Sequence, residues 1–205
     1  MPERLGCLFY STGSPYARIC RMGVLEAGLA DRISESETTL RDPAAAVLPF
    51  SPVGRVPALV LQDGTTLTET SLVLAWLDRM GGAPRLMPTE PPAMAAYGRV
   101  LGLLDGIAVW NRELRRPVQE RSPGVLVLEE TRANRVGDAL ERDVAGGGYA
   151  RLDAGWLALA ATLGYCVRRH TAWDWRRGRP SLGDWFDAAA ARPAFQVTLP
   201  PSNGM

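Results

Sequence analysis

All sequence patterns that predict β-strands lie in the first third of the chain, where they alternate with helical patterns. Residues 5–10 form a short apolar run before the turn-like residues 11–15, which is typical of a buried strand. Ser14 suits a helix N-cap and Pro15 the first helical position, and helical spacing continues to Gly28. The chain is therefore predicted to open with a strand, a tight turn and a helix.

Three more strands and another helix are predicted before residue 81, with a short helix or loop beginning at Asp42-Pro43, which gives the order βαβ-α-ββα. Residues 33–40 alternate and are rich in Ser and Thr, which favours a second strand. Residues 58–61 predict a third strand, Asp63-Gly64 a hairpin turn and residues 65–68 the returning strand. Residues 70–80 have helical spacing and end at Gly81-Gly82.

The chain changes character at the proline-rich residues 83–92, after which no strand pattern follows. Helices are predicted over residues 93–115, 126–144, 152–169 and 181–191. Ser181 and Asp184 have the spacing of a capping box with Asp in place of Glu. We therefore expect an α/β unit at 1–82, a linker at 83–92 and an all-helical unit at 93–205.

Charge and hydropathy exclude several classes of partner. The formal net charge is only +1, so no overall field would attract nucleic acid or an anionic membrane. Apolar runs are too short to span a bilayer and no signal sequence is apparent, so a cytoplasmic protein is expected. All 23 basic residues are Arg, which we attribute to a GC-rich bacterial genome.

The cysteine and histidine content predicts neither a disulfide nor a metal site. Cys7, Cys20 and Cys166 are widely separated without a CxxC motif, so free thiols are expected in a reducing cytosol. His170 is the single histidine and has no ligand residue at metal-binding spacing. We expect no metal, and we interpret His170 as a surface or capping residue.

Three spaced motifs together resemble the glutathione transferase family. They are a strand leading into Ser14-Pro15-Tyr16-Ala17-Arg18, Val56-Pro57 before a strand, and Glu69-Thr70 at a helix start. The resemblance covers nearly the whole chain and extends to the tail beginning at Arg192-Pro193. It implies a thioredoxin-like glutathione-binding domain followed by a helical-bundle domain.

Ser14 is the first candidate for activating the thiol of glutathione. The unperturbed pKa of a thiol lies above neutral, so the site must stabilise the thiolate. A hydroxyl at a helix N-terminus can donate to sulfur where the helix dipole favours negative charge. A simple N-cap explains Ser14 equally well, and Ser11 and Tyr10 remain alternatives for the catalytic role.

The resemblance also implies which residues bind glutathione as co-substrate. Val56-Pro57 resembles the family's cis-proline, where the backbone before proline bonds the cysteinyl part, and Arg55 is placed to pair with a carboxylate. Glu69 is expected to accept from the ligand's amine, and Thr70 stands where the family usually has Ser.

The second-substrate pocket is expected between the turn after the first strand and the first long helix of the back half. Its candidates are Tyr16, Trp110, Asn111 and whichever of Arg112 and Glu113 faces inward. Core packing is the favoured interpretation of Trp110.

The resemblance predicts an enzyme that conjugates glutathione to a small, hydrophobic electrophile, as in detoxification, and that forms a homodimer. Two alternatives stay open. One is a glutathione-dependent isomerase or dehalogenase, and the other is a binding or regulatory protein of the same fold without turnover. Fold alone does not decide between them.

Overall fold

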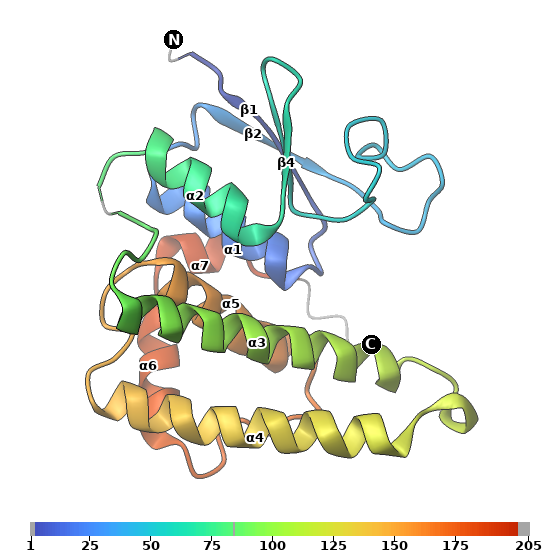
Figure 1. The fold of residues 1–205 in the computed structure, drawn as a ribbon, viewed down its shortest axis with the longest axis vertical. Coiled ribbons are helices and arrows are strands. Elements are labelled where there is room, and N and C mark those ends of the chain that lie inside the picture. The colour runs from blue at the N-terminus through green and yellow to red at the C-terminus, as the bar shows by residue number, and fades with distance from the viewer. Residues whose placement is uncertain (1–2, 84, 201–205) are drawn as a thin grey trace.

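A computed structural model describes residues 3–83 and 85–200 of the chain, which are arranged in two halves (Figure 1). The N-terminal half holds one four-stranded sheet in the order β2-β1-β3-β4. Strand β1 pairs parallel with β2 and antiparallel with β3, and β3 pairs antiparallel with β4. The elements of this half are β1 (Gly6–Tyr10), α1 (Pro15–Glu26), β2 (Ile33–Glu37), β3 (Ala58–Leu61), β4 (Thr66–Thr68) and α2 (Thr70–Met80).

The order and most boundaries of this half follow the local signals. The predicted helix over residues 70–80 is confirmed, and the hairpin forms where Asp63-Gly64 indicated it, with Gly64 at a φ of 83° and Asp63 accepting from the N–H of Thr65. The second strand is shorter than expected, since it ends at Glu37 and not at residue 40.

The two faces of the sheet are covered by different parts of the chain. Leu8 and Leu59 belong to the main core, which also contains the buried residues of α1 and α2. Phe9 and Ala58 pack in a smaller cluster with Val47 from the segment between β2 and β3. Adjacent strand residues therefore point to opposite faces, as the two-residue period of a strand requires.

The C-terminal half is helical, and α3 packs against both α4 and α5. Ser122 caps α4 by accepting from the N–H of Val125, so this helix begins three residues before its predicted start at 126. The elements are α3 (Pro91–Leu114), the 3-10 turn η1 (Val118–Glu120), α4 (Pro123–Ala145), α5 (Ala154–Arg168), α6 (Pro180–Ala190) and α7 (Pro193–Val197).

Helix α5 joins the two halves. Every residue from Ala154 to Cys166 is buried, and the helix packs against α1 as well as α3. The main core therefore continues from the sheet half into the bundle. Leu86, in the predicted linker, is fully buried; its N–H donates to Asp78 and its carbonyl accepts from Ala154. The boundaries 1–82, 83–92 and 93–205 stay a prediction.

The predicted capping box at Ser181 and Asp184 is wrong. Helix α6 begins at Pro180, one residue earlier, so Ser181 lies inside the first turn. The N–H groups of Ser181 and Leu182 donate instead to the two carboxylate oxygens of Glu141 on α4, at 3.0 and 2.7 Å. A distant carboxylate thus satisfies the donors that a local cap would have served.

Helix α3 is long and apolar enough, by composition, to cross a membrane. In the fold it is a core helix of the bundle: Val100, Leu104 and Ile107 are fully buried. Its other sides carry charged residues, among them Arg99 and Arg112.

Candidate functional site

Ser14 ends the turn after β1 and caps α1. Its N–H donates to the carbonyl of Ser11 at 2.9 Å, and its Oγ accepts from the N–H of Ala17 at 3.2 Å. The predicted N-cap is therefore confirmed. The cap uses Oγ as an acceptor, so the hydroxyl hydrogen remains able to donate to a ligand.

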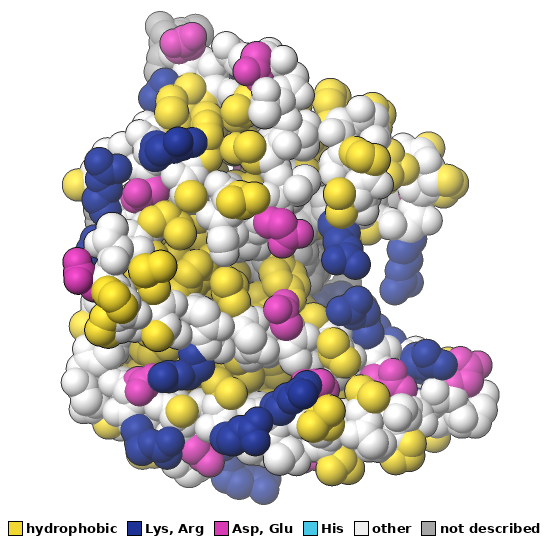
Figure 2. Space-filling model, in the orientation of Figure 1, with side chains coloured by type: hydrophobic (Ala, Val, Ile, Leu, Met, Phe, Trp, Pro, Cys, Tyr) yellow, Lys and Arg dark blue, Asp and Glu magenta, His cyan; other side chains and the backbone are white. Residues whose placement is uncertain are grey.

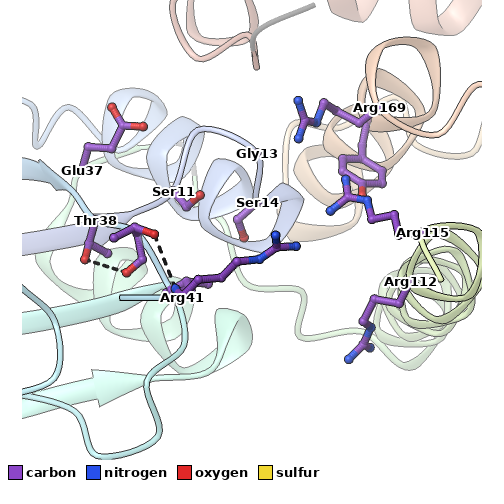
Figure 3. A pocket seen from close by; sticks show the side chains of 12 residues that line it. Ser11, Gly13, Ser14, Glu37, Thr38, Arg41, Arg112, Arg115 and Arg169 are labelled. Carbon is purple, nitrogen blue, oxygen red and sulfur yellow. Dashed lines mark hydrogen bonds between the residues drawn. The ribbon is translucent and has the colours of Figure 1, made fainter. Parts of the chain in front are cut away.

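Two adjoining cavities meet at Ser14, which lines both of them. The larger has a volume of about 1000 Å³ and lies between the turn after β1, the segment after β2 and the ends of α3 and α5 (Figure 3). The smaller has a volume of about 370 Å³ and extends along α3 toward the start of α2. Ser11 lines only the larger one.

Tyr10 does not line either cavity. Its ring lies under the guanidinium of Arg21, 4.0 Å from the ring centroid, and Arg21 in turn pairs with Glu35 at 2.8 Å. Of the three candidates for thiol activation, the structure brings Ser14 and Ser11 to the cleft and leaves Tyr10 outside it.

The residues predicted to hold glutathione line the smaller cavity together. The Val56-Pro57 peptide bond is cis, as the resemblance predicted. Val56 is buried, and among the described residues its backbone N–H and C=O have no hydrogen-bond partner. Arg55, directly before it, is exposed at the mouth. This edge of the backbone is free to pair with an extended ligand.

Glu69 and Thr70 complete the same cavity at the start of α2. Glu69 has a φ of 69°, an unusual conformation for a residue other than glycine, and its side chain makes no capping bond to the helix. Backbone strain of this kind is concentrated at functional sites. The exposed Glu69 carboxylate and the helix N-terminus beside it form a pair of opposite polarity, which suits a ligand with both an amine and a carboxylate.

The opposite wall comes from α3, α5 and the start of α1. The Tyr16 hydroxyl donates to Asp105 at 2.5 Å, and burial followed by that bond raises the pKa of Tyr16, which stays protonated. Asn111 is buried; its amide donates to the Tyr165 hydroxyl, while its Oδ1 has no partner among the described residues. A buried acceptor without a partner is costly unless a ligand or water satisfies it.

Of the two residues left open on α3, Arg112 faces the cavities and Glu113 does not. Glu113 accepts from the N–H of Ser122 at 2.6 Å, beside the start of α4.

Trp110 packs in the core, as its favoured interpretation predicted, and therefore does not belong to the second-substrate pocket for which it was a candidate. It lines neither cavity and is buried in the core, where its ring meets His170 edge-on with centroids 4.7 Å apart. Tyr16, Asn111 and Arg112 line the smaller cavity, so three of the four predicted positions are brought together there.

The interpretation of His170 as a surface or capping residue is also wrong. The ring is 2% exposed, and neither ring nitrogen has a hydrogen-bond partner in residues 3–83 and 85–200. Burial, and then the charge of Arg115, lower its pKa to about 4, so the ring is neutral at physiological pH.

The thiols and acidic groups form no further centre in the described part of the chain. Cys7, Cys20 and Cys166 are free, and burial raises the pKa of the two buried ones, Cys20 and Cys166. No three His, Cys, Asp or Glu side chains of residues 3–83 and 85–200 lie together as metal ligands would.

Arginines dominate the rim of the larger cavity. Arg41 follows β2, Arg112 and Arg115 come from the end of α3, and Arg169 follows α5; Figure 3 shows them around the space in front of Ser14. In the space-filling view, blue side chains stand on both sides of the hollow between the two halves (Figure 2). Of these four, only Arg112 was predicted from the sequence, because the four residues lie far apart along the chain.

The fold and the cleft define a class of protein in which a thioredoxin-like half and a helical half enclose a site with serine at a helix N-terminus. Residues 13–80 match the family model described as the glutathione S-transferase N-terminal domain. This match, together with the relatives described next, supports assignment of the chain to the glutathione S-transferase family.

Named relatives are similar to this chain over almost its full length. An uncharacterized GST-like protein of Escherichia coli K12, YibF, is 27% identical over 194 residues, which cover 92% of this chain and 95% of that protein. A glutathione S-transferase of Methylobacillus flagellatus, solved with glutathione bound, has a TM-score of 0.88 at 24% identity and covers 96% of this chain and 100% of that one. A family member from Pseudomonas fluorescens Pf-5 is 26% identical, with a TM-score of 0.87 over 96% of this chain and 99% of that one in its glutathione complex. It has also been solved with S-(propanoic acid)-glutathione, where the TM-score is 0.85 and the coverage is 96% of this chain and 100% of that one.

Proposed function

We propose that this protein is a glutathione transferase that joins the glutathione thiolate to a small electrophile, with Ser14 as the residue that stabilises the thiolate. The observation that carries the proposal is the position of Ser14. It stands at the N-terminus of α1, where the two cavities meet, with its hydroxyl hydrogen not needed for the cap. A hydroxyl donor and a helix N-terminus both favour a negative sulfur over a neutral thiol.

Glutathione is proposed to occupy the smaller cavity. Glu69 receives its amine, Thr70 and the start of α2 receive the γ-glutamyl carboxylate, and the free backbone edge of Val56 before Pro57 pairs with the cysteinyl residue. Arg55 then takes the remaining carboxylate. This order places the sulfur toward Ser14. Glutathione complexes of the Methylobacillus and Pseudomonas relatives support binding of this co-substrate.

The reaction needs no oxidant or reductant. The thiol loses its proton to water, the sulfur forms a bond to the electrophilic carbon, and either a halide leaves with its bonding electrons or the neighbouring carbon of an activated alkene takes up a proton. The product is a thioether of glutathione, and S-(propanoic acid)-glutathione, bound by the Pseudomonas relative, is a compound of that type. The protein contributes by positioning the thiolate against the electrophile and by stabilising the negative charge electrostatically.

The proposal includes a homodimer and a detoxifying role in a bacterial cytoplasm. The dimer rests on the family resemblance, with the thioredoxin-like half of one subunit against the helical half of the other. The bacterial source rests on the use of arginine for every basic residue. The free thiols are consistent with a reducing compartment.

The test is an ultraviolet difference titration with glutathione across pH, comparing the wild-type protein with Ser14→Gly, Ser14→Ala and, as a control from the same turn, Ser11→Ala. Gly is a tolerable N-cap, so Ser14→Gly removes the hydroxyl with little loss of helix stability. We expect a thiolate band near neutral pH that both Ser14 variants lose, because their thiol pKa rises by about two units, equivalent to about 2.7 kcal/mol. Ser11→Ala should keep the band.

Other outcomes correct the proposal in defined ways. A band unchanged in both Ser14 variants would refute the role of Ser14, and its loss in Ser11→Ala would move the role to Ser11. Binding without a thiolate would indicate a binding or regulatory protein, and turnover that does not consume glutathione would indicate the isomerase or dehalogenase alternative. No binding at all would refute the proposed function.

A further inference from the structure

The larger cavity has an uneven balance of charge. Among the described residues, four arginines line it, whereas Glu37 is the single carboxylate. Glu37 already accepts a hydrogen bond from the Thr12 hydroxyl at 2.9 Å. This excess of positive charge is local to the cavity, because the whole chain has a net charge of only +1. Such a cavity attracts anions and raises their concentration near Ser14.

The arginines at the end of α3 divide into two groups. Arg116 points away from the cavity and pairs with Glu113 and Glu120 at 3.9 and 3.5 Å. Arg115, one residue earlier, has no acidic partner in the described part of the chain, and the Nε of Arg112 donates only to the Ala108 carbonyl of its own helix at 3.1 Å. The guanidinium groups of Arg112 and Arg115 therefore face the cavity without a carboxylate from residues 3–83 or 85–200 to neutralise them.

A third guanidinium lies close to the catalytic turn. A Cβ placed on Gly13 would be 3.4 Å from Nη2 of Arg169, so this side chain lies against the residue that precedes Ser14. The positive groups are thus arranged around the place where the sulfur is expected, and not at the distal rim alone.

Glutathione does not use all of this charge. In the proposed binding mode its two carboxylates are matched by Arg55 and by the start of α2, both in the smaller cavity. Arg112 and Arg115 reach into both cavities from the opposite wall. Arg112 and Arg115 therefore remain available to bind an anionic group that glutathione itself does not carry.

We propose that the electrophile carries a carboxylate, which Arg112 and Arg115 bind while its reactive carbon faces Ser14. This inference rests on the proposed glutathione chemistry and names its substrate class. Arginine is suited to the role because its planar fork donates two parallel hydrogen bonds to a carboxylate. The hydrophobic electrophile expected from the sequence becomes a small acid, whose short carbon skeleton contacts Leu40, Val53 and Ala108.

The size of the effect is limited by solvent. Both arginines are exposed, so water and salt screen the attraction. We expect the carboxylate to strengthen binding about fivefold to tenfold at low ionic strength, with the advantage shrinking as salt is added.

The test compares two glutathione conjugates of nearly equal shape, S-(2-carboxyethyl)glutathione and S-(2-carbamoylethyl)glutathione, by calorimetric titration at low and high salt. The proteins are the wild type, the double variant Arg112→Gln/Arg115→Gln and the control Arg116→Gln. Glutathione itself is titrated into each. The acid should bind the wild type and the control more tightly than the amide, and the preference should fall below about twofold in the double variant and at high salt.

Affinities for glutathione and for the amide should stay within about twofold of wild type in all three proteins, which separates loss of the carboxylate site from general damage. Equal binding of acid and amide by the wild type, or a preference that survives in the double variant, overturns the inference while glutathione binding stands. Failure of the wild type to bind glutathione or either conjugate refutes the proposed function itself.

Discussion

Acidification from about pH 7.5 to about pH 5 should destabilise this protein through one side chain, His170. The folded state holds its pKa at about 4, first through burial and then through the charge of Arg115, against 6.5 for an exposed histidine. The folded pKa is the lower one, so as pH falls the unfolded chain takes up the proton first. The free energy of unfolding therefore decreases with falling pH between the two values and loses no more from this group below about pH 4.

The magnitude follows from the shift. The full difference is equivalent to about 3 kcal/mol, of which about 2 kcal/mol is lost by about pH 5. His170 is the chain's single histidine, and carboxylates with ordinary pKa values titrate mostly below this window. The loss above pH 5 is therefore assigned to one group.

Urea titrations followed by tryptophan fluorescence at a series of pH values and constant protein concentration measure the loss. In His170→Phe an aromatic ring still packs against Trp110 but cannot take a proton, so its stability should be nearly flat over the same window. The reasoning is refuted if wild type and variant lose stability equally, or if the wild type loses none.

Two further results are expected. Glu141→Ala should lower the free energy of unfolding by about 1 kcal/mol, because the N–H groups of Ser181 and Leu182 lose their acceptor. The control Asp184→Ala should change the free energy of unfolding by less than about 0.5 kcal/mol. If urea titrations instead show a larger loss for Asp184→Ala than for Glu141→Ala, the local capping box would be supported. Sedimentation equilibrium should give twice the mass of one chain, and a single-chain mass at micromolar concentration would contradict the proposed homodimer.

The fold was predictable where the signal is local. Ser14-Pro15 marks the start of α1 because an N-cap and its helix are adjacent in sequence, and α2 was bounded correctly at both ends by Thr70 and by Gly81-Gly82. The cis bond at Val56-Pro57 came from the family resemblance and not from the residues themselves, since an arbitrary X-Pro bond favours trans.

Predictions failed where the local structure depends on a residue that is distant in the sequence. Glu141 replaces the local cap of α6 from about forty positions away, and no sequence window that contains Ser181 shows it. His170 has no other ligand residue at metal-binding spacing and was therefore interpreted as a surface or capping residue, but the end of α5 and Trp110 bury it. Local patterns describe which groups need a partner, whereas tertiary packing supplies the partner.

The second-substrate side of the cleft depends on the rotation of α3, and this explains why it was the least predictable part. Successive residues of a helix are about 100° apart, so Trp110 enters the core while Asn111 lines the cavity, and Arg115 faces the cavity while Arg116 pairs on the surface. Apolar and charged residues follow one another so closely along α3 that the sequence pattern does not indicate which side of the helix faces the cavity. The proposed glutathione side was predictable from motifs because the groups expected to bind there are backbone and helix ends. The proposed acceptor side uses side chains from separate elements, and substrate choice is therefore where we expect this chain to differ from its relatives.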